Sequence, residues 1–388
     1  MIKGKLTSSV KQNRFNFKII IFLFLFAISF SQAQSQTWNS VGAGTGWENS
    51  MCVYNGELYV GGVYGILKWN GSTWSAVGPG LDGEVDALCV YNGELYAGGH
   101  FQYAGSLFVS YVARWNGSAW ADLGGGAGSY VTSMIVYNNK LIVAGYFTQV
   151  DLQANYIAAW DGSNWSVLGA GTNGTQGQIM ALTLYNNELI AGGFFSSAGG
   201  IPASRVAKWN GTTWSALGSG IDNVVYALTT YQGDLIVGGL FATAGGVSCA
   251  GIAKWNGSIW SPLGSGIAGI LYPYVLALTT YGTDLYVAGL YTYAGGITCN
   301  GIARWNGSNW FQMNGGFFSS SNVCGAFTVA VYNNELYAGG IFQSAGGTSA
   351  NNIARWNGLT GITPVNTQLP DKFSLSQNYP NLSIPRLK

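Results

Sequence analysis

Apolar and polar positions alternate along this chain in short runs that glycine-rich turns separate. Residues 225–241 contain two such runs, rich in β-branched and aromatic side chains, with Gln232-Gly233 as the turn between them. Residues 251–263 contain two more, and Asn256-Gly257 lies between them as a two-residue turn that would need positive φ at both positions. The pattern predicts four antiparallel β-strands in succession.

The four-strand pattern occurs seven times, and two short motifs mark its period. The tryptophan of a Trp-Asn-Gly triplet, or Trp-Asp-Gly in the third copy, recurs every 45 to 51 residues, at Trp69, Trp115, Trp160, Trp209, Trp255, Trp305 and Trp356. A Tyr-Asn-Gly turn or a variant of it begins at Tyr54, Tyr91, Tyr137, Tyr185, Tyr231, Tyr281 and Tyr332. Periods of this length are typical of propellers and solenoids. The sequence therefore predicts an all-β fold, a seven-bladed β-propeller of four-stranded antiparallel blades.

The two ends of the repeat array indicate how the ring closes. Trp38, in Thr37–Gly42, matches the pattern of a fourth strand, although no first three strands precede it. The last copy stops after its third strand at Trp356, with no fourth strand behind it. We expect the N-terminal strand to complete the last blade, which removes the open sheet edges.

The repeats resemble Kelch and galactose-oxidase-type propellers, whose blades carry a glycine doublet after the second strand and a tryptophan that opens the fourth. The doublets here are Gly61-Gly62, Gly98-Gly99, Gly192-Gly193, Gly238-Gly239 and Gly339-Gly340, with Ala144-Gly145 and Ala288-Gly289 in the other two copies. The resemblance covers the predicted propeller, residues 34–360. It implies a fold and leaves the function to be argued from a site.

Both termini differ in composition from the repeats. Residues 1–33 combine five basic residues with the apolar run 19–30 and end on small residues, which indicates a cleaved signal peptide. Residues 361–388 form a linker and a tail in which Leu369–Asn381 resembles the opening of the C-terminal sorting domain of type IX secretion, here truncated. We expect a secreted protein of the bacterial cell surface or periplasm, with no membrane span after signal cleavage.

Composition and charge exclude several function classes. Removing the five basic residues of the leader from the chain's 16 leaves 11 against 15 acidic residues, a net charge of about −4. Nucleic-acid binding is therefore not expected, because it requires clustered cations. We expect a monomer.

Little of the sequence points to catalysis or to a cofactor. His100 is the one histidine of the chain and takes a repeat position that is Tyr146 or Phe194 elsewhere, so we expect a packed strand residue. Galactose-oxidase copper chemistry and multi-histidine metal sites are thereby excluded, and we predict no catalytic residues, no metal and no cofactor. The five cysteines, Cys52, Cys89, Cys249, Cys299 and Cys324, have no Cys-x-x-Cys spacing, and Cys52 and Cys89 are expected as small buried core residues. A bridge between Cys249 and Cys299 stays open.

Most charged residues recur with the repeat, which favours structural roles. The basic residue before the triplet tryptophan is expected to pack along apolar surface, at Lys68, Arg114, Lys208, Lys254, Arg304 and Arg355. The acidic residue after the first turn is expected to be solvated, at Glu57, Glu94, Glu188, Asp234, Asp284 and Glu335. Asp82-Gly83-Glu84-Val85-Asp86 falls outside the repeat, and it could offer carboxylates to calcium or to glycoside hydrolysis, or form a solvated turn.

Length variation falls in the loops from strand four to strand one and from strand two to strand three, which share one face of a propeller. Binding function concentrates in variable loops on a rigid scaffold. The candidate ligand-binding residues there are Trp47, Tyr103, Tyr130, Tyr272, Tyr274, Tyr293 and Asp222. Aromatic platforms beside polar groups suit a glycan or a protein partner. We predict a binding or scaffold propeller and no enzyme, with a carbohydrate-active enzyme of unrecognised carboxylate site or a purely structural repeat protein as the alternatives.

Overall fold

The computed structural model describes residues 36–42, 46–174, 176–269, 273–320 and 323–357. These residues form strands joined by turns and loops, with no helix among them. The part of the chain that is described therefore contains no helix that is long and apolar enough to cross a membrane. The expected signal peptide (1–33), the tail (361–388) and Tyr272 lie outside the described residues.

Seven four-stranded antiparallel sheets, here called blades, make up the described part of the chain. Blades one to three consist of β2 (Glu48–Tyr54), β3 (Glu57–Gly62), β4 (Gly65–Trp69) and β5 (Trp74–Ala76); β6 (Val85–Tyr91), β7 (Glu94–Gly99), β10 (Val112–Trp115) and β11 (Trp120–Ala121); and β12 (Val131–Tyr137), β13 (Lys140–Gly145), β14 (Ile157–Trp160) and β15 (Trp165–Val167). Blades four and five consist of β17 (Ile179–Tyr185), β18 (Glu188–Gly193), β21 (Val206–Trp209) and β22 (Trp214–Ala216); and β23 (Val225–Tyr231), β24 (Asp234–Gly239), β27 (Ile252–Trp255) and β28 (Trp260–Pro262). Blades six and seven consist of β30 (Tyr274–Tyr281), β31 (Asp284–Leu290), β34 (Ile302–Trp305) and β35 (Trp310–Gln312); and β37 (Gly325–Tyr332), β38 (Glu335–Ile341), β41 (Ile353–Trp356) and β1 (Trp38–Ser40).

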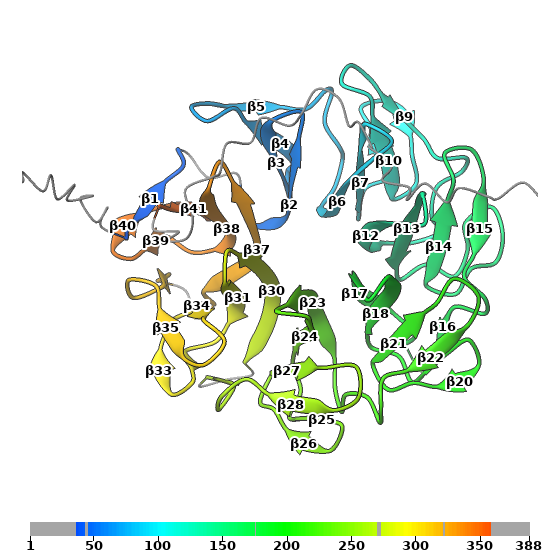
Figure 1. Ribbon diagram of the computed structural model, residues 1–388. Coiled ribbons are helices and arrows are strands. Elements are labelled where there is room, and N and C mark those ends of the chain that lie inside the picture. Colours follow the sequence, from blue (N-terminus) through cyan, green and yellow to red (C-terminus); the bar gives the residue numbers. More distant parts are fainter. Residues whose placement is uncertain (1–35, 43–45, 175, 270–272, 321–322, 358–388) are drawn as a thin grey trace, which may run out of the picture. The chain divides into compact units, whose positions relative to one another are not determined.

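The blades are arranged in a ring (Figure 1), and the region along its axis, which the first strands of the blades surround, is called the channel below. The first strand of each blade contacts the first strand of the next, in the order β2, β6, β12, β17, β23, β30 and β37. The last of these, β37, lies against β2 and so joins the seventh blade to the first. The expectation of an all-β, seven-bladed β-propeller is confirmed.

The N-terminal strand completes the seventh blade as expected. In β1, Trp38 pairs with Trp356, Asn39 with Arg355 and Ser40 with Ala354. Trp38 is almost fully buried, at 1 % exposure. β1 thereby covers the edge of β41 and takes the outer place that the fourth strand has in the other six blades.

The first hairpin turn of each blade behaves as expected and the second does not. Asn55 and Gly56 both have positive φ, at 49° and 75°, as a two-residue turn of this type requires. In the second turn, Trp255 pairs directly with Trp260, so four residues form the loop. Asn256 has no positive φ, and its side-chain oxygen instead accepts the backbone N–H groups of Ser258 and Ile259. The two-residue expectation for Asn256-Gly257 was wrong, because the asparagine side chain itself caps the turn.

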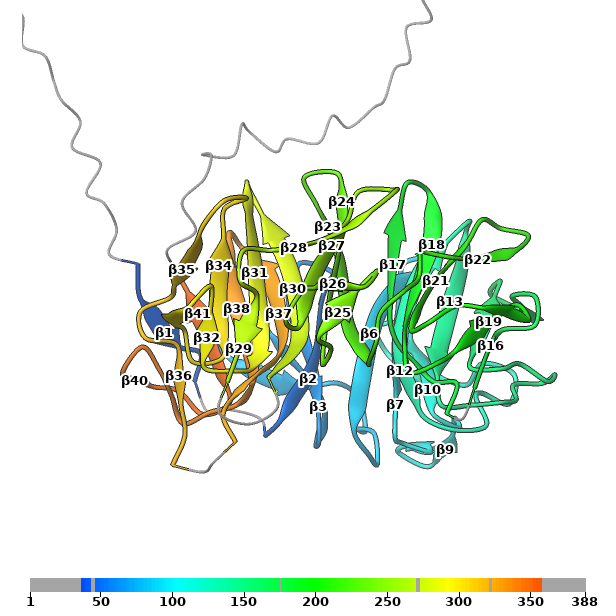
Figure 2. The ribbon, with the colours of Figure 1, turned by 90° about the horizontal axis from the view of Figure 1, so that it is seen from below.

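Short outer hairpins, which the sequence did not predict, occupy the connections between the main strands. They are β8 (Tyr103–Ala104) with β9 (Leu107–Phe108); β16 (Thr172–Asn173) with β19 (Ser197–Ala198) and β20 (Ile201–Pro202); β25 (Thr243–Ala244) with β26 (Val247–Ser248); β29 (Ile267–Ala268) with β32 (Tyr293–Ala294) and β33 (Ile297–Thr298); and β36 (Phe317–Phe318) with β39 (Ser344–Ala345) and β40 (Thr348–Ser349). In Figure 2 the turn between β23 and β24 and the hairpin at β9 lie on opposite sides of the ring. The hairpins belong to the face of the variable loops, which they order.

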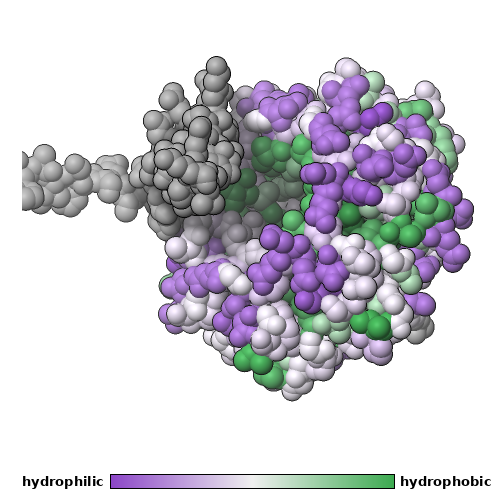
Figure 3. Space-filling model, turned by 45° about the vertical axis from the view of Figure 1, so that its right-hand side comes forward, coloured by the Kyte–Doolittle hydropathy of each residue, from purple (hydrophilic) through white to green (hydrophobic). Residues whose placement is uncertain are grey.

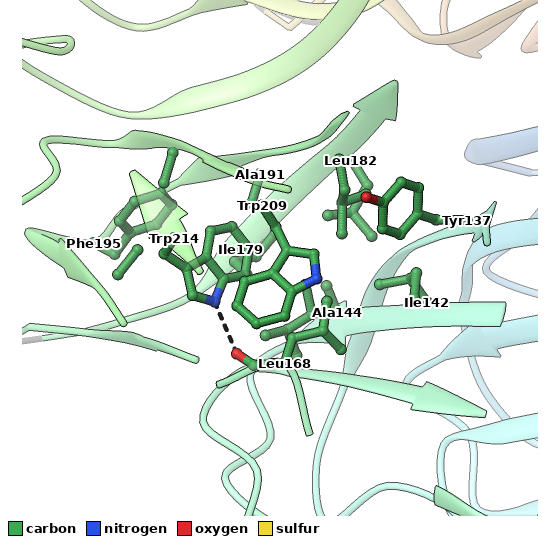
Figure 4. Packing of buried hydrophobic residues seen from close by; sticks show 14 of the residues in the cluster. Tyr137, Ile142, Ala144, Leu168, Ile179, Leu182, Ala191, Phe195, Trp209 and Trp214 are labelled. Carbon is green, nitrogen blue, oxygen red and sulfur yellow. Dashed lines mark hydrogen bonds between the residues drawn. The ribbon is translucent and has the colours of Figure 1, made fainter. Parts of the chain in front are cut away.

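The hydrophobic core lies between neighbouring blades, as the cluster between blades three and four illustrates (Figure 4). Trp209 and Trp214 face each other across two strands with ring centroids 5.4 Å apart. The indole nitrogen of Trp214 donates to the backbone carbonyl of Leu168 at 2.8 Å, which lies after the last strand of the preceding blade. On the side drawn in Figure 3, hydrophilic and neutral residues cover most of the surface, and hydrophobic residues are visible in a hollow and in small patches.

The repeated acidic residues are not merely solvated turn residues, and this expectation was wrong. Each pairs with the basic residue of the third strand in the same blade, at 2.7 to 3.3 Å: Lys68 with Glu57, Arg114 with Glu94, Lys208 with Glu188, Lys254 with Asp234, Arg304 with Asp284 and Arg355 with Glu335. The five cysteines are free, including Cys249 and Cys299, which are buried. Cys52 and Cys89, expected as buried core residues, are half-buried and pack against the hydrophobic clusters between the blades, as Cys324 does.

Candidate functional site

Each blade carries one β-bulge at the same place in its first strand. In blade two, Val85 pairs with Gly99 and Ala87 with Gly98, so that Asp86 between them is the extra residue. The same shift in register occurs in the other six first strands. The seven bulged residues, in ring order, are Asn49, Asp86, Thr132, Met180, Tyr226, Leu276 and Phe327. A bulge re-aims a side chain, and these seven face the central channel.

The second glycine of each doublet exists because of this bulge. A Cβ at Gly99 would lie against the backbone oxygen of Glu84, and a Cβ at Gly193 against that of Gln178. The glycines at the same place in the other five blades meet a backbone oxygen in the same way. The residue after the glycine then donates its N–H to that oxygen, as His100 does to Glu84 at 2.8 Å. The motif therefore fixes the bulged residue of each blade and the start of the loop after the doublet, and three of the residues that follow a doublet reach the cavity described next: His100, Tyr146 and Leu290.

These residues enclose a cavity of about 450 Å³ at the mouth of the channel. All seven bulged residues line it, together with His100, Tyr146, Tyr274 and Leu290. Small-molecule sites are typically of this size and combine apolar walls with a few polar groups. The cavity is the candidate functional site of the protein.

One wall of the cavity holds a cluster of charged groups around His100. The Nε2 atom of His100 lies 3.1 Å from Asp86 Oδ2, and its Nδ1 atom lies 3.7 Å from Glu84 Oε2. The side-chain amide of Asn49 donates to both carboxylates, at 2.9 Å in the case of Asp86. The hydrogen bond to Asp86 is the main reason why the pKa of His100 is raised above its usual value, although partial burial opposes it.

The expectation that His100 packs as an ordinary strand residue was wrong. It follows β7 directly, and its side chain is more than one third exposed. Its ring stacks on Tyr130, with centroids 3.8 Å apart and planes 16° apart. Glu84, Asp86 and His100 offer one ligand atom each within 4.8 Å of one another, an arrangement in which carboxylate and imidazole groups could hold a cation.

The structure brings some of the sequence candidates to this cavity. Tyr274 lines it and contacts Tyr226 edge to face, with ring centroids 5.8 Å apart. Tyr130 adjoins it through the stacked His100 and through Tyr146, whose ring lies 6.2 Å away. These residues form two groups of ring contacts, Tyr226 with Tyr274 and Tyr130 with His100 and Tyr146.

Other candidates lie elsewhere on the same face. Tyr103 belongs to the outer hairpin β8–β9 and packs edge to face on Phe108. Tyr293 belongs to β32 in another outer hairpin, and Trp47 precedes β2 with more than half of its side chain exposed. None of the three lines the cavity.

Asp222 has a structural role that the sequence reading missed. Its carboxylate accepts the backbone N–H groups of Ala242 and Thr243 and the hydroxyl of Thr243, at 2.9 to 3.1 Å. Asp82 makes the equivalent bonds to Gln102 and Tyr103 in blade two. Both carboxylates hold an outer hairpin in place, and their oxygens are engaged by it.

The sequence reading also missed the ring of bulged residues. The signal for it is a position that varies while its neighbours repeat: Val-Asp-Ala at 85–87 corresponds to Ile-Met-Ala at 179–181 and Val-Tyr-Ala at 225–227. The residues on either side of the bulged position repeat because they pack in the core. The bulged residue changes in charge and polarity from blade to blade, which indicates a role other than packing.

No protein-family model matches the chain, and no curated protein sequence matches it either. Among solved structures, the extracellular domain of BT4673 from B. thetaiotaomicron aligns with a TM-score of 0.55 and 10 % identity, over 82 % of this chain and 39 % of that chain. A second structure of that domain gives 0.56 and 10 %, over 83 % and 40 %. The WD40 β-propeller domain of Doa1 gives 0.52 and 12 %, over 83 % of this chain and 96 % of that one. These similarities support the β-propeller fold.

Proposed function

We propose that the protein is an exported binding module of the cell surface, which takes a carbohydrate or a segment of a protein partner into the mouth of its central channel. The observation that carries this proposal is the cavity of about 450 Å³, which the bulged residue of every blade helps to line. A rigid ring that presents seven non-repeating side chains to one cavity is the arrangement expected of a binding site on a repeat scaffold.

The lining suits a ligand that has both apolar and polar surface. Tyr146, Tyr226, Tyr274 and Phe327 supply aromatic faces and edges, while Asn49 and Thr132 supply an amide and a hydroxyl. Aromatic rings bury apolar area at little conformational cost, and polar groups beside them fix orientation. A sugar ring or the side chains of a peptide offers this combination.

A glycoside hydrolase is the runner-up, because Glu84 and Asp86 converge near the channel. Glycosidases need their two carboxyl groups on opposite sides of the scissile bond. Glu84 and Asp86 instead accept hydrogen bonds from the same amide, that of Asn49, and both adjoin His100. Two carboxylates on one wall favour binding over hydrolysis, so the proposal is a binding protein and not an enzyme.

The cellular location rests on the leader and on similarity. Residues 1–33 have the composition of a signal peptide, and residues 369–381 resemble the start of a type IX sorting domain. The same fold occurs in an extracellular domain of a B. thetaiotaomicron protein. Both observations favour action outside the cytoplasm.

Glycan and peptide arrays probed with the chain from residue 34 onward test the proposal. Tyr226→Ala and Tyr274→Ala should weaken binding of any hit at least tenfold, while Ile259→Ser should leave it unchanged. Ile259 is the matched control because it is 63 % exposed in a turn on the opposite face. Binding that survives both tyrosine changes would place the site elsewhere, and the absence of any hit would leave a structural repeat protein.

A further inference from the structure

The cavity has two unlike halves. Going around the ring, the bulged residues of blades one to three are Asn49, Asp86 and Thr132, all polar, and His100 stands beside them. The bulged residues of blades four to seven are Met180, Tyr226, Leu276 and Phe327, which are apolar or aromatic. A ligand that fills the cavity therefore meets hydrogen-bonding and charged groups at one end and apolar surface at the other.

The polar half is negatively charged. Asp86 lines the cavity, and Glu84 adjoins it through the shared amide of Asn49 and through His100. With His100 protonated the three ionisable groups carry a net charge of −1, and with His100 neutral they carry −2. No lysine or arginine is among the described residues that line the cavity.

The basic side chains of the blades are engaged elsewhere. Six of them pair with acidic residues of the second strands. Arg205 of blade four lies over the ring of Phe194, 4.4 Å from its centroid, and Phe194 takes the repeat position of His100. Arg205 also donates to the backbone carbonyl of Phe195 at 2.8 Å, and it is not among the described residues that line the cavity.

We propose that the cavity binds a ligand that carries a protonated primary amine attached to an apolar or aromatic body, with the ammonium group at Asp86 and the body against Met180, Tyr226 and Leu276. This inference rests on the proposed binding function and names the ligand class for it. A free arylalkylamine and the lysine side chain of a peptide share this chemistry.

An ammonium group fits the acidic half for two reasons. Its three N–H donors can reach a carboxylate, a side-chain amide oxygen and a tyrosine hydroxyl, and Asp86, Asn49 and Tyr146 offer these acceptors at one wall. Asp86 is close enough to Tyr146 to contribute, after burial, to the raised pKa of its hydroxyl. The hydrogen bonds from Asn49 hold the carboxylates in place before a ligand arrives, which lowers the entropy lost on binding.

Calorimetry with three isosteric probes tests the charge requirement on the chain from residue 34 onward: phenethylammonium, 2-phenylethanol and phenylacetate. We expect phenethylammonium to bind at least tenfold more tightly than the alcohol, and phenylacetate to bind more weakly than either. An acetyl-Lys-amide peptide with a neighbouring phenylalanine, compared with its norleucine analogue, distinguishes a side-chain source from a free amine.

Variants then locate the ammonium group. Asp86→Asn and Glu84→Gln, singly and together, should weaken the binding of phenethylammonium at least tenfold. The affinity for 2-phenylethanol should change by less than twofold. Asp122→Asn, an exposed carboxylate next to the outer strand β11, is the matched control. The melting temperature of each variant shows whether it folds. If the double variant does not fold, the two single variants still test the proposal.

The outcomes separate this inference from the proposed function. Equal affinity for the amine and the alcohol, or no effect of the carboxylate variants, would overturn the ammonium site. Binding of a neutral glycan that Tyr226→Ala weakens, with no binding of either amine, would overturn the inference and leave the proposed function standing. Amine binding that Tyr226→Ala and Tyr274→Ala do not change would contradict both.

Discussion

The indole nitrogen of Trp38 donates to the backbone carbonyl of Met313 at 2.9 Å, across 275 positions of sequence. Equivalent bonds join Trp74 to Val41, Trp165 to Leu123, Trp214 to Leu168, Trp260 to Leu217 and Trp310 to Leu263. Each tryptophan opens the fourth strand of a blade and reaches the residue just after the fourth strand of the preceding blade. The N-terminal strand therefore has the same bond to the preceding blade as five of the six fourth strands within the array, and only Trp120 of blade two lacks it among them.

Replacing Trp38 with alanine should lower the free energy of unfolding by about 3–5 kcal/mol, because a buried aromatic side chain is lost from a rigid core. Urea denaturation of the chain from residue 34 onward measures this. Ser40→Ala, at an exposed position of the same strand, is the control and should change stability little. A chain that starts at Ser50 should melt at a lower temperature than either, and an unchanged melting temperature would contradict closure by β1.

The two glycines of a doublet should differ in their tolerance of alanine. A Cβ at Gly192 meets the side chain of Val225, which can shift, so Gly192→Ala should cost about 1–3 kcal/mol. A Cβ at Gly193 meets the backbone oxygen of Gln178, so Gly193→Ala should cost more and distort the bulge at Met180. Thermal unfolding of the two variants compares them directly. Equal losses would mean that the bulge does not dictate the second glycine.

The ion pairs of the blades should contribute unequally to stability. Asp284 is buried, at 5 % exposure, and accepts a hydrogen bond from Arg304 at 2.8 Å. Arg304→Met leaves that carboxylate buried without its partner and should cost about 1–3 kcal/mol. Lys254→Met breaks a more exposed pair and should cost about 0–1 kcal/mol. Chemical denaturation of both variants measures the two losses in the free energy of unfolding. A larger loss for Lys254→Met would contradict the expectation that the buried pair contributes more.

The fold could be predicted closely from the sequence because the same pattern of strands and turns occurs seven times. Val225–Tyr231 is the strand expected there, and Trp38 fell in the missing place of the seventh blade. The turn after Trp255 could not be inferred from Asn256-Gly257 alone, because the same dipeptide fits a turn with two positive φ angles and one that an asparagine side chain caps. The outer hairpins involve strands of two residues, which carry no detectable alternation.

The candidate site was less predictable, since it depends on one extra residue in each first strand. Without the bulge, Asp86 would follow the alternation of β6, and nothing in the sequence sets it beside His100. Among the aromatic candidates of the variable loops, Tyr274 lines the cavity, whereas Tyr103 packs on its own hairpin. The bonds of Asp222 to an outer hairpin could not be predicted, because a carboxylate that caps a hairpin and one that faces a ligand look alike in sequence.

The titration of His100 can be followed without ambiguity, because the chain contains no other histidine. Asp86 raises the pKa of His100, so its NMR midpoint should lie above the usual value of about 6.5, and Asp86→Asn should lower it. Glu84→Gln should lower it less. A raised pKa in the folded state favours the protonated form, so this contribution to stability is present below the unfolded-state pKa and is lost as pH rises through the folded-state value. A midpoint that Asp86→Asn leaves unchanged would contradict the contact.

Binding of phenethylammonium should strengthen as pH rises through the raised pKa of His100. The groups that face His100 are Asp86, Glu84 and Tyr130. Loss of the imidazolium proton therefore adds one unit of negative charge beside an ammonium that remains protonated, and by linkage the bound amine should in turn lower the midpoint of His100. Calorimetry between pH 5.5 and 8.5 measures the slope. His100→Phe, which places the residue of blade four at this position, should bind the amine with little pH dependence across the same range. An affinity that falls with rising pH, or an equal slope in that variant, would show that His100 does not share its carboxylates with the ligand.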